Sequence, residues 1–138
     1  MNVVLGGETK YFSLVAEGAT LFDKKEYALA ANRFWKAFRL RPGAPIVLFN
    51  IARTMEELKD PRAEDFYVAA GAQGNVDAFY QLATYCLRHG RTGEALEHLR
   101  AYLKGNPAND SCTIWARNMI HRLCPAPMLV WSRGEKIA

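Results

Sequence analysis

The sequence predicts an all-α protein built from antiparallel helix pairs, and three observations support this prediction. Residues 18–42 place small and aromatic residues at helical spacing and end in a proline. A similar pattern returns near Ala83 and ends at Pro107, so the chain repeats itself. Half of the 138 residues are hydrophobic and 23% are charged, which is typical of a folded chain with a buried core.

Residues 10–44 form the first predicted unit, which follows an N-terminal extension of residues 1–9. Helices are expected at residues 10–22 and 26–40, and Pro42 stops the second of them. Small residues stand where the two helix axes must approach closely, and aromatic residues fill the space between. The two stripes are Leu14, Gly18 and Leu21 in the first helix, and Tyr27, Ala30, Phe34 and Ala37 in the second.

Residues 45–75 form a second, less regular unit. Asp60 and Pro61 are expected to be the N-cap and the first-turn proline of its second helix. The closing proline of the first unit is missing here, and Gly74 and Asn75 supply the turn instead. The helical stripes are Leu48, Ile51, Ala52 and Met55, followed by Ala63, Tyr67 and Ala70.

Residues 76–109 form the third unit, and residues 110–124 a final helix with Asp110 as its N-cap. A single helix that covers the open end of a stack of pairs is what a repeat array needs for solubility. The tail, residues 125–138, contains an apolar patch at residues 128–131. This patch could bind its own chain or a second copy, so self-association is left open.

The net charge of the chain limits the classes of partner that it is expected to bind. A formal net charge of +4 is mildly basic, and the basic residues are spread among acidic ones, so we expect no nucleic-acid footprint.

Apolar runs such as residues 46–51 are too short to span a bilayer, and residues 1–7 lack the features of a secretory signal. Three cysteines are too few for a disulfide framework, which favours a reducing, cytoplasmic location.

The repeat resembles that of the tetratricopeptide repeat (TPR) family over residues 11–123. The period is near 34 residues, with an alanine–aromatic–alanine core and a terminal proline. The resemblance implies three repeats and a capping helix, wound into a right-handed superhelical solenoid of antiparallel helix pairs. The matching positions are Gly18, Tyr27, Ala30, Phe34, Ala37 and Pro42 in the first repeat, and Ala83, Ala95, Leu99 and Pro107 in the third.

The resemblance also implies that the first helices of successive repeats line a concave groove that binds a peptide segment. Apolar residues in this lining lie off the core stripes of their helices, so each must pack against a neighbour or wait for a partner. The implied lining is Phe12, Val15, Ala19, Phe22, Ile46, Phe49, Asn50, Arg53, Tyr80, Gln81, Thr84, Arg88 and Trp115.

TPR domains that bind chaperones hold a C-terminal carboxylate with a clamp of Lys, Asn and Arg side chains. Only Asn50 fits among the corresponding positions here, and an aspartate stands where a cation is needed, so we expect no such clamp. Arg53 and Arg88 remain as guanidinium groups that could hold an acidic side chain. The five clamp positions are Val15, Ala19, Asn50, Asp77 and Gln81.

The sequence contains two Cys/His pairs and one carboxylate pair that could carry metal or catalytic chemistry. Cys86 with His89, and His121 with Cys124, have the spacing of a zinc quartet, but Cys86 occupies a core position where a thiol acts as a small apolar residue. Glu56 and Glu57 are helix neighbours that point in different directions, so they are expected to be solvated. No phosphate-binding loop or nucleophile motif is present. We therefore expect no enzyme, no cofactor and no metal.

The sequence thus predicts a non-catalytic protein–protein interaction module, a scaffold or adaptor that binds a peptide segment, with an acidic one favoured by Arg53 and Arg88. The alternative is a dedicated chaperone of a secreted or unstable partner, similar to the three-repeat TPR chaperones of type III secretion translocators.

Overall fold

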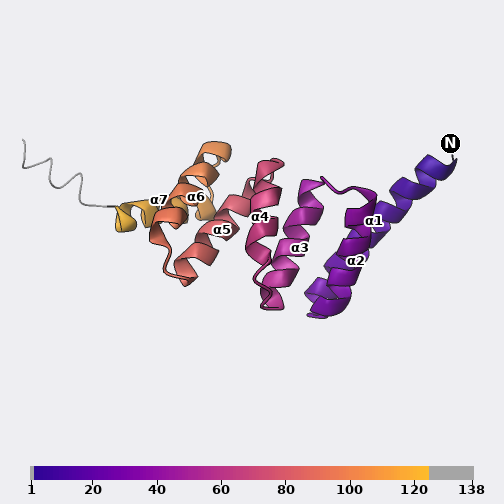
Figure 1. The fold of residues 1–138 in the computed structure, drawn as a ribbon. Helices are drawn as coiled ribbons and strands as arrows, with labels where there is room; N and C mark the ends of the chain where they lie inside the picture. Colours follow the sequence, from indigo (N-terminus) through magenta and orange to yellow (C-terminus); the bar gives the residue numbers. More distant parts are fainter. Residues whose placement is uncertain (1, 125–138) are drawn as a thin grey trace, which may run out of the picture. The chain divides into compact units, whose positions relative to one another are not determined.

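The structure, a computed structural model, describes residues 2–124. This part of the chain is all-α and contains no strand (Figure 1). It divides into two compact units, Met1–Ala78 and Phe79–Ala138. The helices are α1 Asn2–Asp23, α2 Tyr27–Leu40, α3 Pro45–Glu57, α4 Ala63–Ala72, α5 Asp77–Arg88, α6 Thr92–Gly105 and α7 Ser111–Leu123.

The helix bounds confirm the predicted pairs and correct two details. The first correction is that α1 begins at Asn2, so most of the predicted N-terminal extension is helical and projects beyond α2 (Figure 1). A helix gains one hydrogen bond for each residue it adds after nucleation, and the packed part of α1 provides that nucleus. No proline interrupts residues 2–9. Among the described residues, no helix has both the length and the apolarity that crossing a membrane requires.

The second correction concerns the start of α4. Asp60 does not cap this helix, which begins at Ala63 with Arg62 as its N-cap residue. The Asp60 carboxylate instead accepts the backbone N–H of Arg62 at 2.9 Å and its guanidinium at 2.8 Å. The bond with the Arg62 guanidinium, and to a lesser extent the bond with the Arg62 N–H, hold the pKa of Asp60 below its usual range. Asp60 therefore closes a turn before the helix. Asp110 is the predicted N-cap of α7, since it accepts the N–H of Thr113 at 2.9 Å.

Four of the turns between helices share one motif. The residue after each turn bonds through its N–H to a carbonyl five residues back: Glu26 to Leu21, Asp60 to Met55, Asn75 to Ala70 and Arg91 to Cys86. The residue before it has a positive φ, which is the arrangement of a Schellman motif. Gly74 and Gly90 adopt this conformation readily, whereas Lys25 and Lys59 adopt it in the other two turns.

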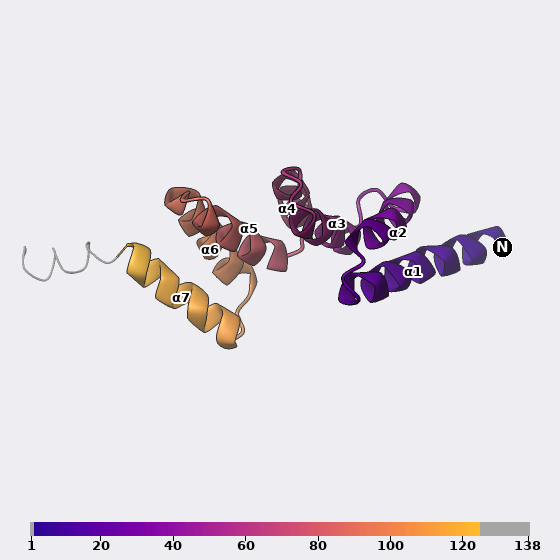
Figure 2. The same ribbon diagram turned by 90° about the horizontal axis from the view of Figure 1, so that it is seen from below.

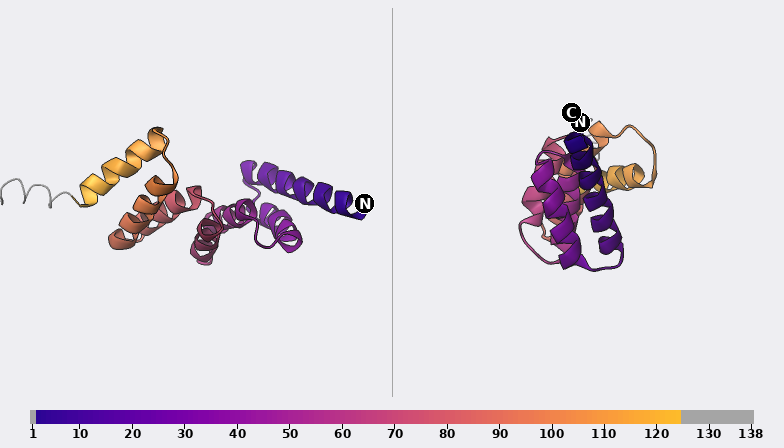
Figure 3. Two further views of the ribbon diagram at one scale, coloured as in Figure 1. Left: turned by 90° about the horizontal axis from the view of Figure 1, so that it is seen from above. Right: turned by 90° about the vertical axis from the view of Figure 1, so that its right-hand side faces the viewer.

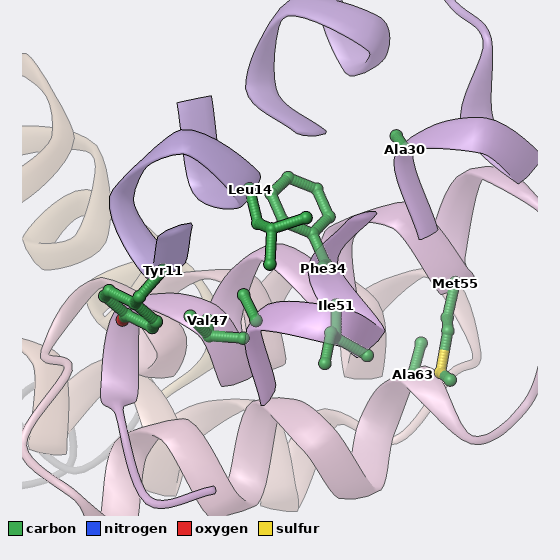
Figure 4. Close-up of a cluster of buried hydrophobic side chains, with 9 residues drawn as sticks. Tyr11, Leu14, Ala30, Phe34, Val47, Ile51, Met55 and Ala63 are labelled. Atoms are coloured by element: carbon green, nitrogen blue, oxygen red, sulfur yellow. The ribbon is translucent and has the colours of Figure 1, made fainter. Parts of the chain in front are cut away.

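In the first unit, α1 lies against α2 and α3 against α4, and α2 also contacts α3 (Figure 2). The closest approach of α1 and α2 is at Gly18, where an added Cβ would stand 2.5 Å from the Phe34 ring. The predicted role of this small residue is confirmed. The core joins all four helices through side chains drawn in Figure 4: Tyr11, Leu14, Ala30, Phe34, Val47, Ile51, Met55 and Ala63.

In the second unit, α7 lies against α6, as Figure 3 shows. The core position predicted for Cys86 is confirmed, because this side chain is fully buried. The buried residues in the described part of this unit are Leu82, Ala83, Cys86, Ala95, Leu99, Tyr102, Thr113 and Ala116.

Candidate peptide-binding surface

The predicted lining in the first unit lies on two helices that contact each other, α1 and α3. We call it the α1–α3 surface. Phe12 is 58% exposed and Ile46 is 49% exposed, so residues 2–124 leave about half of each of these apolar side chains uncovered. Ala19 is exposed and the remaining residues are half-buried. The surface consists of Phe12, Val15, Ala19, Phe22, Ile46, Phe49, Asn50 and Arg53.

Arg53 joins the two helices. Its guanidinium carbon lies 4.4 Å from the centre of the Phe22 ring on α1 and 5.8 Å from the centre of the Phe49 ring on its own helix. Both distances are in the range of a cation–π contact. The Phe49 ring in turn packs edge-on against Tyr67 of α4, at 5.9 Å between centres. The cation therefore rests on rings that are themselves fixed by the core.

The carboxylates nearest to Arg53 in the sequence are those of Glu56 and Glu57. Tyr67 donates its hydroxyl hydrogen to Glu56 Oε1 at 2.8 Å. Burial raises the pKa of Tyr67, and the positive charge of Arg53 opposes this shift without cancelling it. Burial and the charge of Glu57 raise the pKa of Tyr27 as well. Both hydroxyls therefore stay protonated near neutral pH.

None of the ion pairs in the described part of the chain includes Arg53. The prediction that both glutamates are solvated is confirmed for Glu57, which is exposed, and is wrong for Glu56, which is half-buried and accepts a hydrogen bond from Tyr67. The sequence signal for this contact is a tyrosine in the following helix, which does not reveal the pairing.

A second cation lies at the other end of the α1–α3 surface. The guanidinium carbon of Arg41 lies 4.2 Å from the Tyr11 ring centre and 5.3 Å from that of Phe12. Tyr11 is buried, whereas Phe12 offers most of its ring to solvent. This end is therefore an exposed aromatic face with a cation at its edge.

The predicted lining in the second unit is arranged differently. The Tyr80 ring lies 5.3 Å from the Tyr102 ring and 5.3 Å from the Trp115 ring, so these side chains pack on one another. Burial raises the pKa of Tyr80, and the electrostatic influence of Cys112 raises it further. Gln81 is half-buried, and Thr84, also half-buried, donates its hydroxyl hydrogen to the Gln81 carbonyl at 2.9 Å. Arg88 is exposed.

The candidate zinc quartet is not assembled. Within residues 2–124, no three of Cys86, His89, His121 and Cys124 bring their ligand atoms within 4.8 Å of one another. Cys86 lies in the core, and His89 Nδ1 lies 2.8 Å from the carbonyl oxygen of Tyr85.

A shallow depression of about 460 Å³ lies elsewhere, between α1 and α2. It is lined by Ala16, Glu17, Thr20, Leu21 and Arg33, none of which belongs to the predicted lining. The Arg33 guanidinium forms an ion pair with Glu17 at 3.0 Å, so the charges here are already matched. The depression offers no unpaired group to a ligand.

Comparison with known proteins identifies the fold. No family profile matches the chain, and no curated protein matches it significantly. Solved structures do match, over most of both chains. The first TPR domain of Spaghetti (RPAP3), bound to the HSP90 peptide SRMEEVD, has a TM-score of 0.72 at 21% identity, covering 87% of this chain and 94% of that one.

Two further structures agree. The Arabidopsis OM64 TPR domain has a TM-score of 0.71 at 22% identity and covers 87% of this chain and 98% of its own. The second TPR domain of human RPAP3, in complex with the HSP70 peptide SGPTIEEVD, has a TM-score of 0.71 at 17% identity and covers 85% of this chain and 97% of its own. The chain therefore has the fold of a tetratricopeptide repeat domain.

Proposed function

We propose that this protein is a non-catalytic interaction module, a scaffold or adaptor, that binds a peptide segment of a partner protein on the α1–α3 surface. One observation carries the proposal. Arg53 is a cation held on two aromatic rings, with no ion pair within residues 2–124, on the same surface as the exposed Phe12 and Ile46. Exposed apolar side chains beside a positioned charge are typical of a binding surface.

The expected energetics are those of a weak to moderate interaction. Covering the exposed parts of Phe12 and Ile46 would contribute about 1 kcal/mol each, at about 25 cal/mol per Å² of apolar surface. A carboxylate on Arg53 would contribute about 1.5–3 kcal/mol as a charge-assisted hydrogen bond. Because the rings already hold the guanidinium, little side-chain entropy is lost on binding.

The structural neighbours support an acidic partner. Two of them are bound to peptides that end in EEVD. At the positions of the carboxylate clamp, however, Val15 and Ala19 have no side-chain donor. We therefore propose that this chain binds an acidic side chain through Arg53. The chaperone alternative gains no support from these neighbours.

The location proposed for this module is the cytoplasm. All three cysteines lie in the described part of the chain, and no disulfide joins them. Reduced cysteines are expected in a reducing compartment.

The test compares partner capture by four immobilised full-length proteins, quantified by mass spectrometry. These are the wild type, Arg53→Gln, Phe12→Ser and, as the matched control, Arg39→Gln, which removes an exposed cation from α2. We expect a set of proteins that both surface variants lose and the control retains. Identical capture by all four proteins would refute the proposal.

A further inference from the structure

The α1–α3 surface has two chemically different ends. The inference drawn from this difference rests on the proposed function and specifies the pattern of the ligand. On α3, Ile46, Asn50 and Arg53 share one face by their i, i+4, i+7 spacing. Ile46 and Arg53 are seven residues apart, which is about 10.5 Å along the helix at 1.5 Å per residue. An apolar position and a cation are thus held at a fixed separation.

The residues of α1 match this order. Short turns join α1 to α2 and α2 to α3, so α1 and α3 run in the same direction. Phe22, near the end of α1, contacts Arg53 near the end of α3. At the other end, Phe12 contacts Arg41, which lies just before α3 begins. At one end the apolar side chains of Phe12 and Ile46 are exposed, with Arg41 over the Tyr11 ring and at the edge of Phe12. At the other end Phe22 and Phe49 carry the guanidinium of Arg53, and we call this the cationic end.

The cationic end is suited to a carboxylate from outside. Glu56 accepts a hydrogen bond from Tyr67, and none of the ion pairs among the described residues includes Arg53. A guanidinium presents several donors in one plane, and the two rings hold that plane in position. The charge of this end therefore selects an acidic side chain.

Asn50 indicates the conformation of the ligand. Its side-chain amide lies between the two ends on the same helical face and makes no hydrogen bond within residues 2–124. An amide can pair with the backbone of an extended peptide, whose N–H and C=O groups are exposed. A helical ligand has already satisfied these groups internally. The surface is therefore suited to an extended segment.

We propose that the ligand is an extended segment in which a bulky apolar residue stands three positions from an acidic residue. An extended chain rises about 3.3 Å per residue, so three positions span about 10 Å, which matches the separation of Ile46 and Arg53. The apolar residue covers Phe12 and Ile46, the acidic residue binds Arg53, and the backbone between them pairs with Asn50.

The experiment measures dissociation constants of the full-length chain for synthetic peptides with blocked termini. Each contains one phenylalanine and one glutamate in a serine–glycine background, separated by one, two, three, four, five or seven positions, in both orders. We expect the tightest binding at a separation of three, about 5-fold or more tighter than at one or five. For the best peptide, Arg53→Gln should weaken binding about 10-fold, whereas Arg39→Gln should not.

A peptide with glutamine in place of glutamate should bind wild type and Arg53→Gln equally. Arg53→Lys, which keeps the charge without the planar group, should retain part of the affinity, and thermal unfolding would confirm that each variant folds. Equal affinity at all separations overturns the pattern, as does tightest binding at seven, the helical spacing. Either result leaves the proposed function intact if Arg53→Gln still alters partner capture. Unchanged capture in that assay refutes the function itself.

Discussion

Two aromatic clusters at related places in the two units differ in what covers them. Phe49 near the start of α3 and Tyr80 near the start of α5 each pack on a buried tyrosine from the next helix, Tyr67 or Tyr102. The guanidinium of Arg53 lies over the Phe49 ring, whereas the indole of Trp115 lies against Tyr80. The first cluster therefore presents a charge at its surface, whereas the rings of the second cluster pack against one another.

The difference originates four residues further along each helix. Arg53 follows Phe49 by four residues, and Thr84 follows Tyr80 by four. Residues four apart lie on one helix face, so the long arginine reaches the rings while the threonine bonds back to its own backbone. Trp115 of α7 then provides the cover in the second unit. We therefore propose that related scaffold positions serve binding in the first unit and stability in the second.

The largest effect is expected from removing the cover in the second unit. Trp115→Ala should lower the free energy of unfolding by about 2–4 kcal/mol, because a half-buried indole and its contact with Tyr80 are lost. Urea denaturation measures this change. A loss below about 0.5 kcal/mol would mean that Trp115 is a surface group like Arg53, and the contrast between the clusters would fail.

Removing the guanidinium that covers Phe49 in the first unit should affect stability much less. Arg53→Gln should lower the free energy of unfolding by no more than about 1 kcal/mol, the scale of a partly exposed cation–π contact. Its main effect should be the loss of peptide affinity described above. Measuring both quantities on one preparation separates the roles, and a loss of stability as large as that of Trp115→Ala would contradict the assignment of Arg53 to binding.

Tyr67→Phe probes the hydrogen bond that holds Glu56. It should cost about 1 kcal/mol of stability, because a fully buried side chain loses its hydrogen bond to Glu56. Urea denaturation measures this change. Peptide affinity should not change, because the Phe22 and Phe49 rings still hold the guanidinium of Arg53. A loss of affinity as large as that of Arg53→Gln would contradict this expectation.

Tyrosine hydroxyls predict an alkaline limit to stability. The folded-state pKa values of Tyr27, Tyr67 and Tyr80 are raised. A raised pKa contributes stability that is present below the unfolded value near 10 and is lost as pH rises through the folded value. Unfolding measured between pH 8 and pH 11 should show this loss in both units, and Tyr67→Phe should reduce it. A stability curve that is flat above pH 10 would contradict the prediction.

The smallest effect is expected at the turn after α3. Lys59 has a φ of 62°, which favours glycine. Relief of about 1 kcal/mol of left-handed strain is partly offset by the backbone entropy of glycine, so Lys59→Gly should gain about 0.5 kcal/mol. Thermal unfolding would detect it. Lys59 is exposed in the turn and is not part of the α1–α3 surface, so peptide affinity should not change.

Much of the scaffold was predictable because its signals are local. Gly18 faces Phe34 at the predicted close approach, and Asp110 caps its helix as expected. The Schellman turns at Lys25 and Lys59 could not be predicted from the sequence, because lysine rarely adopts a positive φ.

The site was harder to predict because its contacts join distant parts of the chain. Phe22 and Arg53 come from different helices, and so do Glu56 and Tyr67. Helical spacing placed Phe49 and Tyr80 off the core stripes, yet it could not decide which would be covered by a cation and which by an indole. That choice depends on tertiary packing, which periodicity does not record.

The most direct test of this account is a titration of the peptide with three-position spacing into isotopically labelled full-length protein, followed by NMR. The account predicts that the Nε–Hε resonance of Arg53 and the side-chain amide of Asn50 shift with one saturable affinity, together with the backbone amides of Phe12 and Ile46. Saturable binding that leaves the Arg53 resonance unchanged, with shifts confined to α2, α4 or the second unit, would contradict it.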